Sequence, residues 1–282
     1  MSRDAELMRR IRVQFDDPSW LTRSRLKNRR SALWVALAVL LTVYFFDWGL
    51  STERAIQCLI DERVPTDRCI DTVASWEWMP VVTIVSSLGI LAYAIGGYPF
   101  QFPRDKPAWR EVSYVGLAWA TPLFLTRSSA LFLPDSVCPG SAAAPEPWLS
   151  LSQLGGPAEE VWFAAAVAVW MLLWADRPLT KALGVLVGGG VLRGVFHVYQ
   201  GWESIGLFAW GAVAALAVAL TGRWVILFIM HCLNNALITA GDLDNVTVAA
   251  LLVLICFVPL AFASDRKTTR PPSSKPESSP RT

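Results

Sequence analysis

Eight apolar stretches, each close to the length of about 20 residues that a helix needs to cross a bilayer, make up most of this 282-residue chain. They cover residues 32–50, 79–97, 112–133, 157–174, 179–199, 205–220, 224–240 and 246–263. Hydrophobic residues are 54% of the sequence and charged residues only 17%, which is too little charge to cover the surface of a soluble domain of this size. We therefore predict an all-α fold, a polytopic transmembrane bundle of about eight helices.

The loops between these stretches alternate in charge. The N-terminus, the C-terminus and three loops are basic (98–110, 176–181, 222–223), whereas the other loops are net acidic or lack Lys and Arg (51–78, 134–147, 241–245). Because cytoplasmic loops carry an excess of Lys and Arg, we expect a multi-pass protein of the cell membrane with both termini in the cytoplasm. The net charge of +2 does not indicate a nucleic-acid partner, since the basic residues lie at the ends of the apolar stretches. The 14 Trp residues suit the aromatic belts that form at membrane interfaces.

Composition divides the chain into three regions. Residues 1–31 form a basic cytoplasmic arm, residues 32–264 the transmembrane bundle, and residues 265–282 a cytoplasmic tail with the composition of a disordered segment. The arm contains apolar residues that fit one side of a short helix on an anionic membrane surface, although a solvated basic arm explains the same sequence: Leu7, Met8, Ile11 and Phe15.

Two cysteines, Cys58 and Cys69, lie in the long loop that we place outside the cytoplasm. Cysteines in an oxidising compartment commonly form disulfides, so we predict a disulfide between them, with two reduced thiols as the alternative.

Two adjacent carboxylates, Glu159 and Glu160, open the fourth stretch in the sequence Gly-Gly-Pro-Ala-Glu-Glu. A structural explanation is available, because Pro157 suits the first position of a helix and glutamates in a first turn favour the helix dipole. A functional explanation is also available, because a carboxylate within a bilayer is costly and by default marks a site. The dipole would keep such a carboxylate ionised, as a general base requires.

The two histidines of the sequence both lie in apolar stretches, each four residues from another polar side chain. Arg193 precedes His197, and His231 precedes Asn235, so each pair falls on one face of a helix. A buried guanidinium in a membrane pairs with an acid or lines a wet cavity. Since three helices each contribute a polar pair, we predict that they meet in one cavity.

The order Glu-Glu, His and His-x-x-x-Asn over an eight-helix bundle resembles the CPBP intramembrane proteases, the Abi family, bacterial relatives of the eukaryotic type II CAAX prenyl endopeptidase. The resemblance extends over about residues 110–260. It implies that Glu159 activates the attacking water with help from His197 and that Glu160 has a supporting role. It also implies that His231 and Asn235 bind the developing oxyanion.

Two positions depart from the family pattern. Ala164 stands where the first motif usually has Arg, and Arg193 stands where the second usually has Phe. We predict that Arg193 supplies, from the fifth helix, the charge missing at Ala164 and forms an ion pair with Glu159 or Glu160.

The resemblance implies an intramembrane endopeptidase that cleaves a membrane-associated peptide or protein and needs no cofactor. A zinc metalloprotease is an alternative, although the sequence has no His-Glu-x-x-His motif. A non-catalytic membrane scaffold or immunity-type protein of the same fold is a further alternative.

The predicted depths of the site residues disagree. At 1.5 Å per residue, Glu159 and His197 lie roughly 22–24 Å from the cytoplasmic ends of their helices, His231 about 10 Å and Asn235 about 16 Å. Helix tilt, or a turn at residues 221–223 buried below the cytoplasmic surface, would bring them level.

Overall fold

The computed structural model describes residues 9, 15, 18, 20–21, 30–46, 79–96, 109–130, 155–197, 203–241 and 243–265. The helices in these ranges are α3 (Arg30–Tyr44), α6 (Met79–Ile95), α7 (Trp109–Ala130), α8 (Gly155–Leu173), α9 (Pro178–Leu183), η3 (Gly184–Gly188), α10 (Gly189–Phe196), α11 (Glu203–Thr221), α12 (Trp224–Gly241) and α13 (Asn245–Asp265). Because α9, the π-helical η3 and α10 follow one another without a break, they form one rod. The described residues therefore contain eight helical rods and no strand, and the predicted all-α bundle is confirmed.

Much of the surface of the bundle is apolar. Two helical segments, Gly156–Leu173 and Ser204–Thr221, are long and apolar enough to cross a bilayer. Large apolar side chains are exposed along α3, along the rod from α9 to α10 and along α13, including Val35, Val187, Leu254, Ile255 and Phe257. An exposed apolar surface of this extent needs lipid or protein to cover it.

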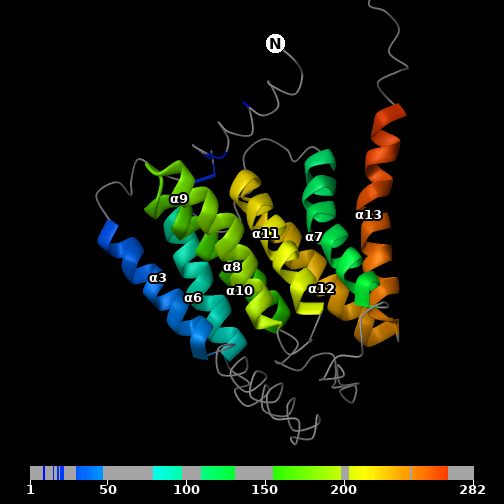
Figure 1. Ribbon diagram of the computed structural model, residues 1–282, viewed down its shortest axis with the longest axis horizontal. Coiled ribbons are helices and arrows are strands. Elements are labelled where there is room, and N and C mark those ends of the chain that lie inside the picture. Colours follow the sequence, from blue (N-terminus) through cyan, green and yellow to red (C-terminus); the bar gives the residue numbers. More distant parts are fainter. Residues whose placement is uncertain are drawn as a thin grey trace, which may run out of the picture.

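Helix α8 lies inside the bundle. In Figure 1, α3 and α6 lie at one side and α7 and α13 at the other, with α8, α10 and α11 between them. α8 packs against α3, α6, α11 and α12, and it is apolar on all sides, as expected for a central helix. The Trp162 indole nitrogen on α8 donates to the Leu40 carbonyl of α3 at 2.8 Å, and its ring packs on Tyr44. The polar groups of α8 therefore face other helices.

Glycines allow α10 and α11 to approach each other closely. A Cβ on Gly211 would lie 2.6 Å from the Arg193 Cβ and 2.7 Å from the Gly189 carbonyl oxygen. Helices in membranes commonly pack through such small residues, because backbone contact then replaces side-chain contact. This crossing places Arg193 between α8 and α11.

Residues of the N-terminal arm cover the turn between α11 and α12. The Trp20 indole nitrogen donates to the Ala219 carbonyl at 3.1 Å, and its ring fills the space beside Gly222, which has a φ of 67°. Next to Gly222, Arg223 is 3% exposed and forms an ion pair with Glu111 at the start of α7. The turn is therefore covered by the N-terminal arm and tied to α7.

Phe15 was expected to face a membrane surface or solvent, but it contacts the bundle. Its carbonyl accepts a hydrogen bond from the buried Lys181 ammonium at 3.0 Å, and its ring lies 5.1 Å from the same nitrogen. The predicted disulfide between Cys58 and Cys69, and the predicted tail beyond Asp265, lie outside the described residues.

The assignment of the Trp residues to interfacial belts was wrong for several of them. Trp119, Trp162, Trp210 and Trp224 are at most 2% exposed and pack inside the bundle. An indole ring buries a large apolar area and can use its N–H within a protein interior, so a count of Trp residues does not locate them.

Candidate active site

Glu159 and Glu160 lie in the second turn of α8, with side chains buried among the other helices. The helix begins at Gly155, so Pro157 is its third residue and not its first, and the first turn contains no acidic residue. The prediction that both glutamates lie in the first turn was therefore wrong by one turn. Glu159 is 4% exposed and Glu160 is 1% exposed. Helix capping consequently does not account for either residue.

Arg193, on α10, pairs with both glutamates. Its Nε donates to Glu159 Oε1 at 2.8 Å, and its second terminal nitrogen forms an ion pair with Glu160 Oε1. The ion pair predicted from the sequence is therefore confirmed, and it is shared between the two acids. The guanidinium is fully buried, which makes this pairing necessary for its charge.

Two aromatic rings enclose the Arg193 guanidinium. Its carbon lies 3.9 Å from the ring centroid of Trp210 on α11 and 4.7 Å from that of Phe163 on α8. A guanidinium between two aromatic faces gains cation–π attraction and excludes water from the ion pairs. The position of the positive charge is thus fixed by three helices.

Glu160 joins three helices through a single oxygen. Besides the Arg193 pair, its Oε1 accepts from Trp119 Nε1 at 3.1 Å and interacts with His231 Nδ1 at 2.9 Å. Its Oε2 is buried and has no hydrogen-bond partner among the described residues. Since one oxygen is occupied by fixed donors and the other is enclosed, Glu160 suits a positioning role rather than a reaction with substrate.

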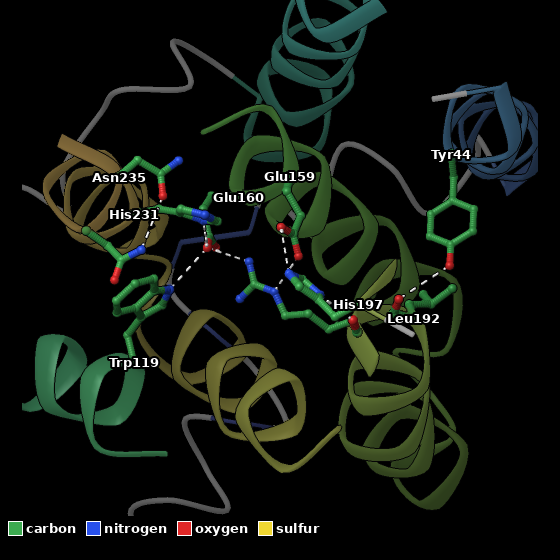
Figure 2. A network of polar contacts seen from close by, with 10 residues as sticks. Tyr44, Trp119, Glu159, Glu160, Leu192, His197, His231 and Asn235 are labelled. Atoms are coloured by element: carbon green, nitrogen blue, oxygen red, sulfur yellow. Dashed lines mark hydrogen bonds and ion pairs between the residues drawn. The ribbon is translucent and has the colours of Figure 1, made fainter. Parts of the chain in front are cut away.

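Glu159 and His197 face each other across a short gap (Figure 2). Glu159 Oε2 lies 3.9 Å from His197 Nε2, too far for a direct hydrogen bond. His197 follows the last residue of α10, so it lies at the helix end and not within the predicted helix to residue 199. Its Nδ1 lies 2.8 Å from the Arg193 carbonyl oxygen. A carbonyl only accepts, so Nδ1 carries the proton and Nε2 is an acceptor in the neutral ring.

His231 and Asn235 on α12 point toward the start of α8. Because Glu160 accepts, His231 Nδ1 carries a proton, and the ring directs Nε2 away from Glu160. A Cβ on Gly156 would collide with His231 Nε2 and would lie 2.8 Å from Asn235 Nδ2. Both nitrogens therefore lie beside one point near the beginning of α8. Gly156 lacks the Cβ that would collide with these side chains, so they can approach the start of α8.

The side chains do not form an evident metal centre. Among the described residues, no three or more His, Cys, Asp or Glu side chains are grouped so that they would hold a metal ion. Both glutamates are paired with the Arg193 cation, which would repel Zn²⁺.

The structure brings together all six residues proposed from the sequence and adds three aromatic residues that sequence reasoning missed. Trp119 donates to Glu160, and Trp210 and Phe163 enclose Arg193. Trp210 also packs edge-on against His197, with ring centroids 5.8 Å apart. The sequence contains only a weak signal for these aromatic residues. A buried indole N–H needs a hydrogen-bond acceptor, so a Trp in an apolar helix is favoured near a polar group of another helix.

The same segment of the chain matches a known family. Residues 144–237 match the family model described as type II CAAX prenyl endopeptidase Rce1-like. No curated protein and no solved structure matches the chain. The matched range is narrower than the predicted range of 110–260, but it includes every residue from Glu159 to Asn235. The resemblance to the CPBP and CAAX proteases is therefore confirmed for residues 144–237, the segment that contains all six proposed site residues.

Proposed function

We propose that the protein is a glutamic-type intramembrane endopeptidase that cleaves a membrane-associated peptide or protein. The family match supports a CAAX-type intramembrane protease at the level of the family. The observation that carries the finer proposal is the 3.9 Å gap between Glu159 Oε2 and His197 Nε2, two acceptors that face each other.

A water molecule in this position donates one hydrogen to each acceptor. Its oxygen lone pairs then remain available to attack a carbonyl carbon, while Glu159 takes the proton as general base. The ion pair with Arg193 places a fixed positive charge beside Glu159. The same proton can later pass from Glu159 to the leaving amine, so that water and a peptide bond yield a carboxylic acid and an amine.

His231 and Asn235 suit the stabilisation of the tetrahedral intermediate. Asn235 Nδ2 donates a hydrogen bond to the oxyanion near Gly156. His231 Nε2 also donates when the ring is an imidazolium, while Nδ1 stays in contact with Glu160 Oε1. Arg193 and Glu160 act as positioning residues, because they contact the reacting groups and not the substrate.

The proposal includes a multi-pass arrangement in the cell membrane with both termini in the cytoplasm. The site lies where α8 begins and α10 ends, which by the loop charges is the outer half of the bilayer. The substrate class is therefore a peptide segment that reaches the bundle from the lipid or from its outer surface.

A turnover assay in proteoliposomes tests this function. A panel of fluorogenic membrane-anchored peptides, each with and without a prenyl group, would be incubated with the wild type and with Glu159→Gln, His197→Ala, His231→Ala and Asn235→Ala. We expect Glu159→Gln and His197→Ala to remove nearly all turnover and Asn235→Ala to lower it ~10²–10³-fold. Asn245→Ala, at the exposed start of α13, is the matched control and should retain activity.

Two results would contradict the proposal. If the purified wild type cleaves no peptide in the panel, or if Glu159→Gln retains wild-type turnover, the glutamic mechanism is wrong and a scaffold role gains support. If turnover disappears with a chelator and returns on addition of Zn²⁺, the metalloprotease alternative replaces it.

A further inference from the structure

The side chain of Asn235 has two ends with opposite hydrogen-bonding roles. The amide nitrogen Nδ2 donates and the amide oxygen Oδ1 accepts, and the two ends have nearly the same shape. Nδ2 of Asn235 and Nε2 of His231 both lie next to Gly156. Only this orientation can stabilise an oxyanion, because the reversed amide would place a lone pair against the developing negative charge.

The orientation of this amide is set by its neighbour Asn234. The Nδ2 of Asn234 donates to Oδ1 of Asn235 at 3.2 Å, which occupies the accepting end and leaves the donating end for the site. Adjacent residues of a helix do not normally face each other. A side-chain hydrogen bond between them is therefore a particular arrangement and does not follow from helix geometry.

Such a restraint is needed because the two ends of the amide have nearly the same shape. An unrestrained amide rotates and presents its oxygen as readily as its nitrogen to the point beside Gly156 and His231 Nε2. The Asn234 bond opposes this rotation by holding Oδ1 of Asn235.

We propose that Asn234 is a positioning residue that holds the Asn235 amide with its nitrogen toward the oxyanion. This inference rests on the proposed function for its effect on turnover, but the hydrogen bond itself can be examined separately. The spacing His-x-x-x-Asn accounts for Asn235 and gives no reason for a second polar residue beside it. Asn234 is half-buried in an apolar helix, where an amide needs a partner.

The first test is a double-mutant cycle on turnover with Asn234→Ala, Asn235→Ala and both together. We expect Asn234→Ala to lower kcat about tenfold with little change in KM, because the donor is misdirected and not removed. In the Asn235→Ala background, the same change should have almost no effect, since the two residues act through one group. Asn234→Asp, which cannot donate, should lower kcat at least as much, and Asn245→Ala should leave it unchanged.

The second test does not need activity. The sequence contains only four Asn residues, so side-chain amide signals from ¹⁵N-asparagine in the full-length protein can be assigned by substitution. The Asn235 side-chain signal should move in Asn234→Ala and in Asn234→Asp, but not in Asn245→Ala.

The inference is overturned if Asn234→Ala leaves kcat unchanged, if it lowers kcat equally in both backgrounds, or if the Asn235 signal stays in place. If the wild type has no turnover on any substrate, the proposed function fails. The amide signal would then still decide whether Asn234 restrains Asn235.

Discussion

Replacing Arg193 with Met should destabilise the bundle by leaving two adjacent buried carboxylates without their cation. Met has a similar length and no charge, so the substitution removes the interactions with Glu159 and Glu160 while filling much of the space. Removing one partner of a buried ion pair typically costs ~3–5 kcal/mol, and the acid can reduce this cost by taking up a proton. Loss of the contacts with the Trp210 and Phe163 rings adds to the cost.

The charge balance can be separated from packing with a second substitution. Glu160→Gln removes one negative charge and keeps an oxygen that accepts from Trp119 and His231. We therefore expect Arg193→Met with Glu160→Gln to be more stable than Arg193→Met alone. The stability of Arg193→Lys should lie between those of the wild type and Arg193→Met. An ammonium retains the positive charge but lacks the forked guanidinium that reaches both acids. The measurement is the thermal unfolding midpoint in detergent together with denaturant unfolding.

A further variant tests whether Arg193 takes the place of the Arg that the first motif of the similar family usually has at the position of Ala164. Ala164 is buried one helical turn from Glu160, so an Arg at this position starts on the correct face of α8. Arg193→Phe combined with Ala164→Arg should recover stability and turnover that Arg193→Phe alone loses. The reasoning is refuted if Arg193→Met is as stable and active as the wild type, or if neither second substitution improves its parent variant.

Three other predictions follow from individual contacts. Gly156→Ala should reduce turnover by at least tenfold with normal folding, because its methyl group would displace His231 and Asn235; a wild-type rate in the proteoliposome assay would contradict this. Trp20→Ala should lower the unfolding free energy by ~3–5 kcal/mol and Trp20→Phe by only about 1 kcal/mol, because Phe loses the hydrogen bond and keeps most of the packing. With the other four cysteines replaced by Ser, Cys138 should react with a membrane-impermeant thiol reagent from outside intact cells, and labelling only from the cytoplasmic side would reverse the predicted orientation.

The helices could be predicted from the sequence because lipid imposes one strong requirement. Each crossing needs a long apolar run with internally satisfied backbone groups, and such runs are visible in the composition. The boundaries were less predictable. Pro157 suggested the start of the fourth helix, but the glycines before it also adopt helical geometry, so α8 begins at Gly155.

The polar members of the site could also be predicted, because charged and polar groups are rare within apolar stretches and need one another. Arg193 and its acids are the clearest example. The aromatic members were not predictable in this way. Trp119 and Trp210 are compatible with lipid, an interface or a core, and only the packing of separate helices decides among these positions.

By residue count, His231 lies about 10 Å from the predicted cytoplasmic end of its helix, whereas Glu159, next to Glu160, lies roughly 22–24 Å from the corresponding end of its own helix. Contacts between α7 and α12 show how His231 nevertheless reaches Glu160. Contacts connect α7 and α12 at two levels. At the first level, Glu111 forms an ion pair with Arg223. At the second level, Trp119 and His231 both contact the same oxygen, Oε1 of Glu160. On each helix the two residues are eight positions apart, so the two levels are separated by about 12 Å on both. The buried Arg223 pair thus sets the register between α7 and α12. Trp20 covers the turn at the level of this pair, since its indole nitrogen donates to the Ala219 carbonyl and its ring packs beside Gly222.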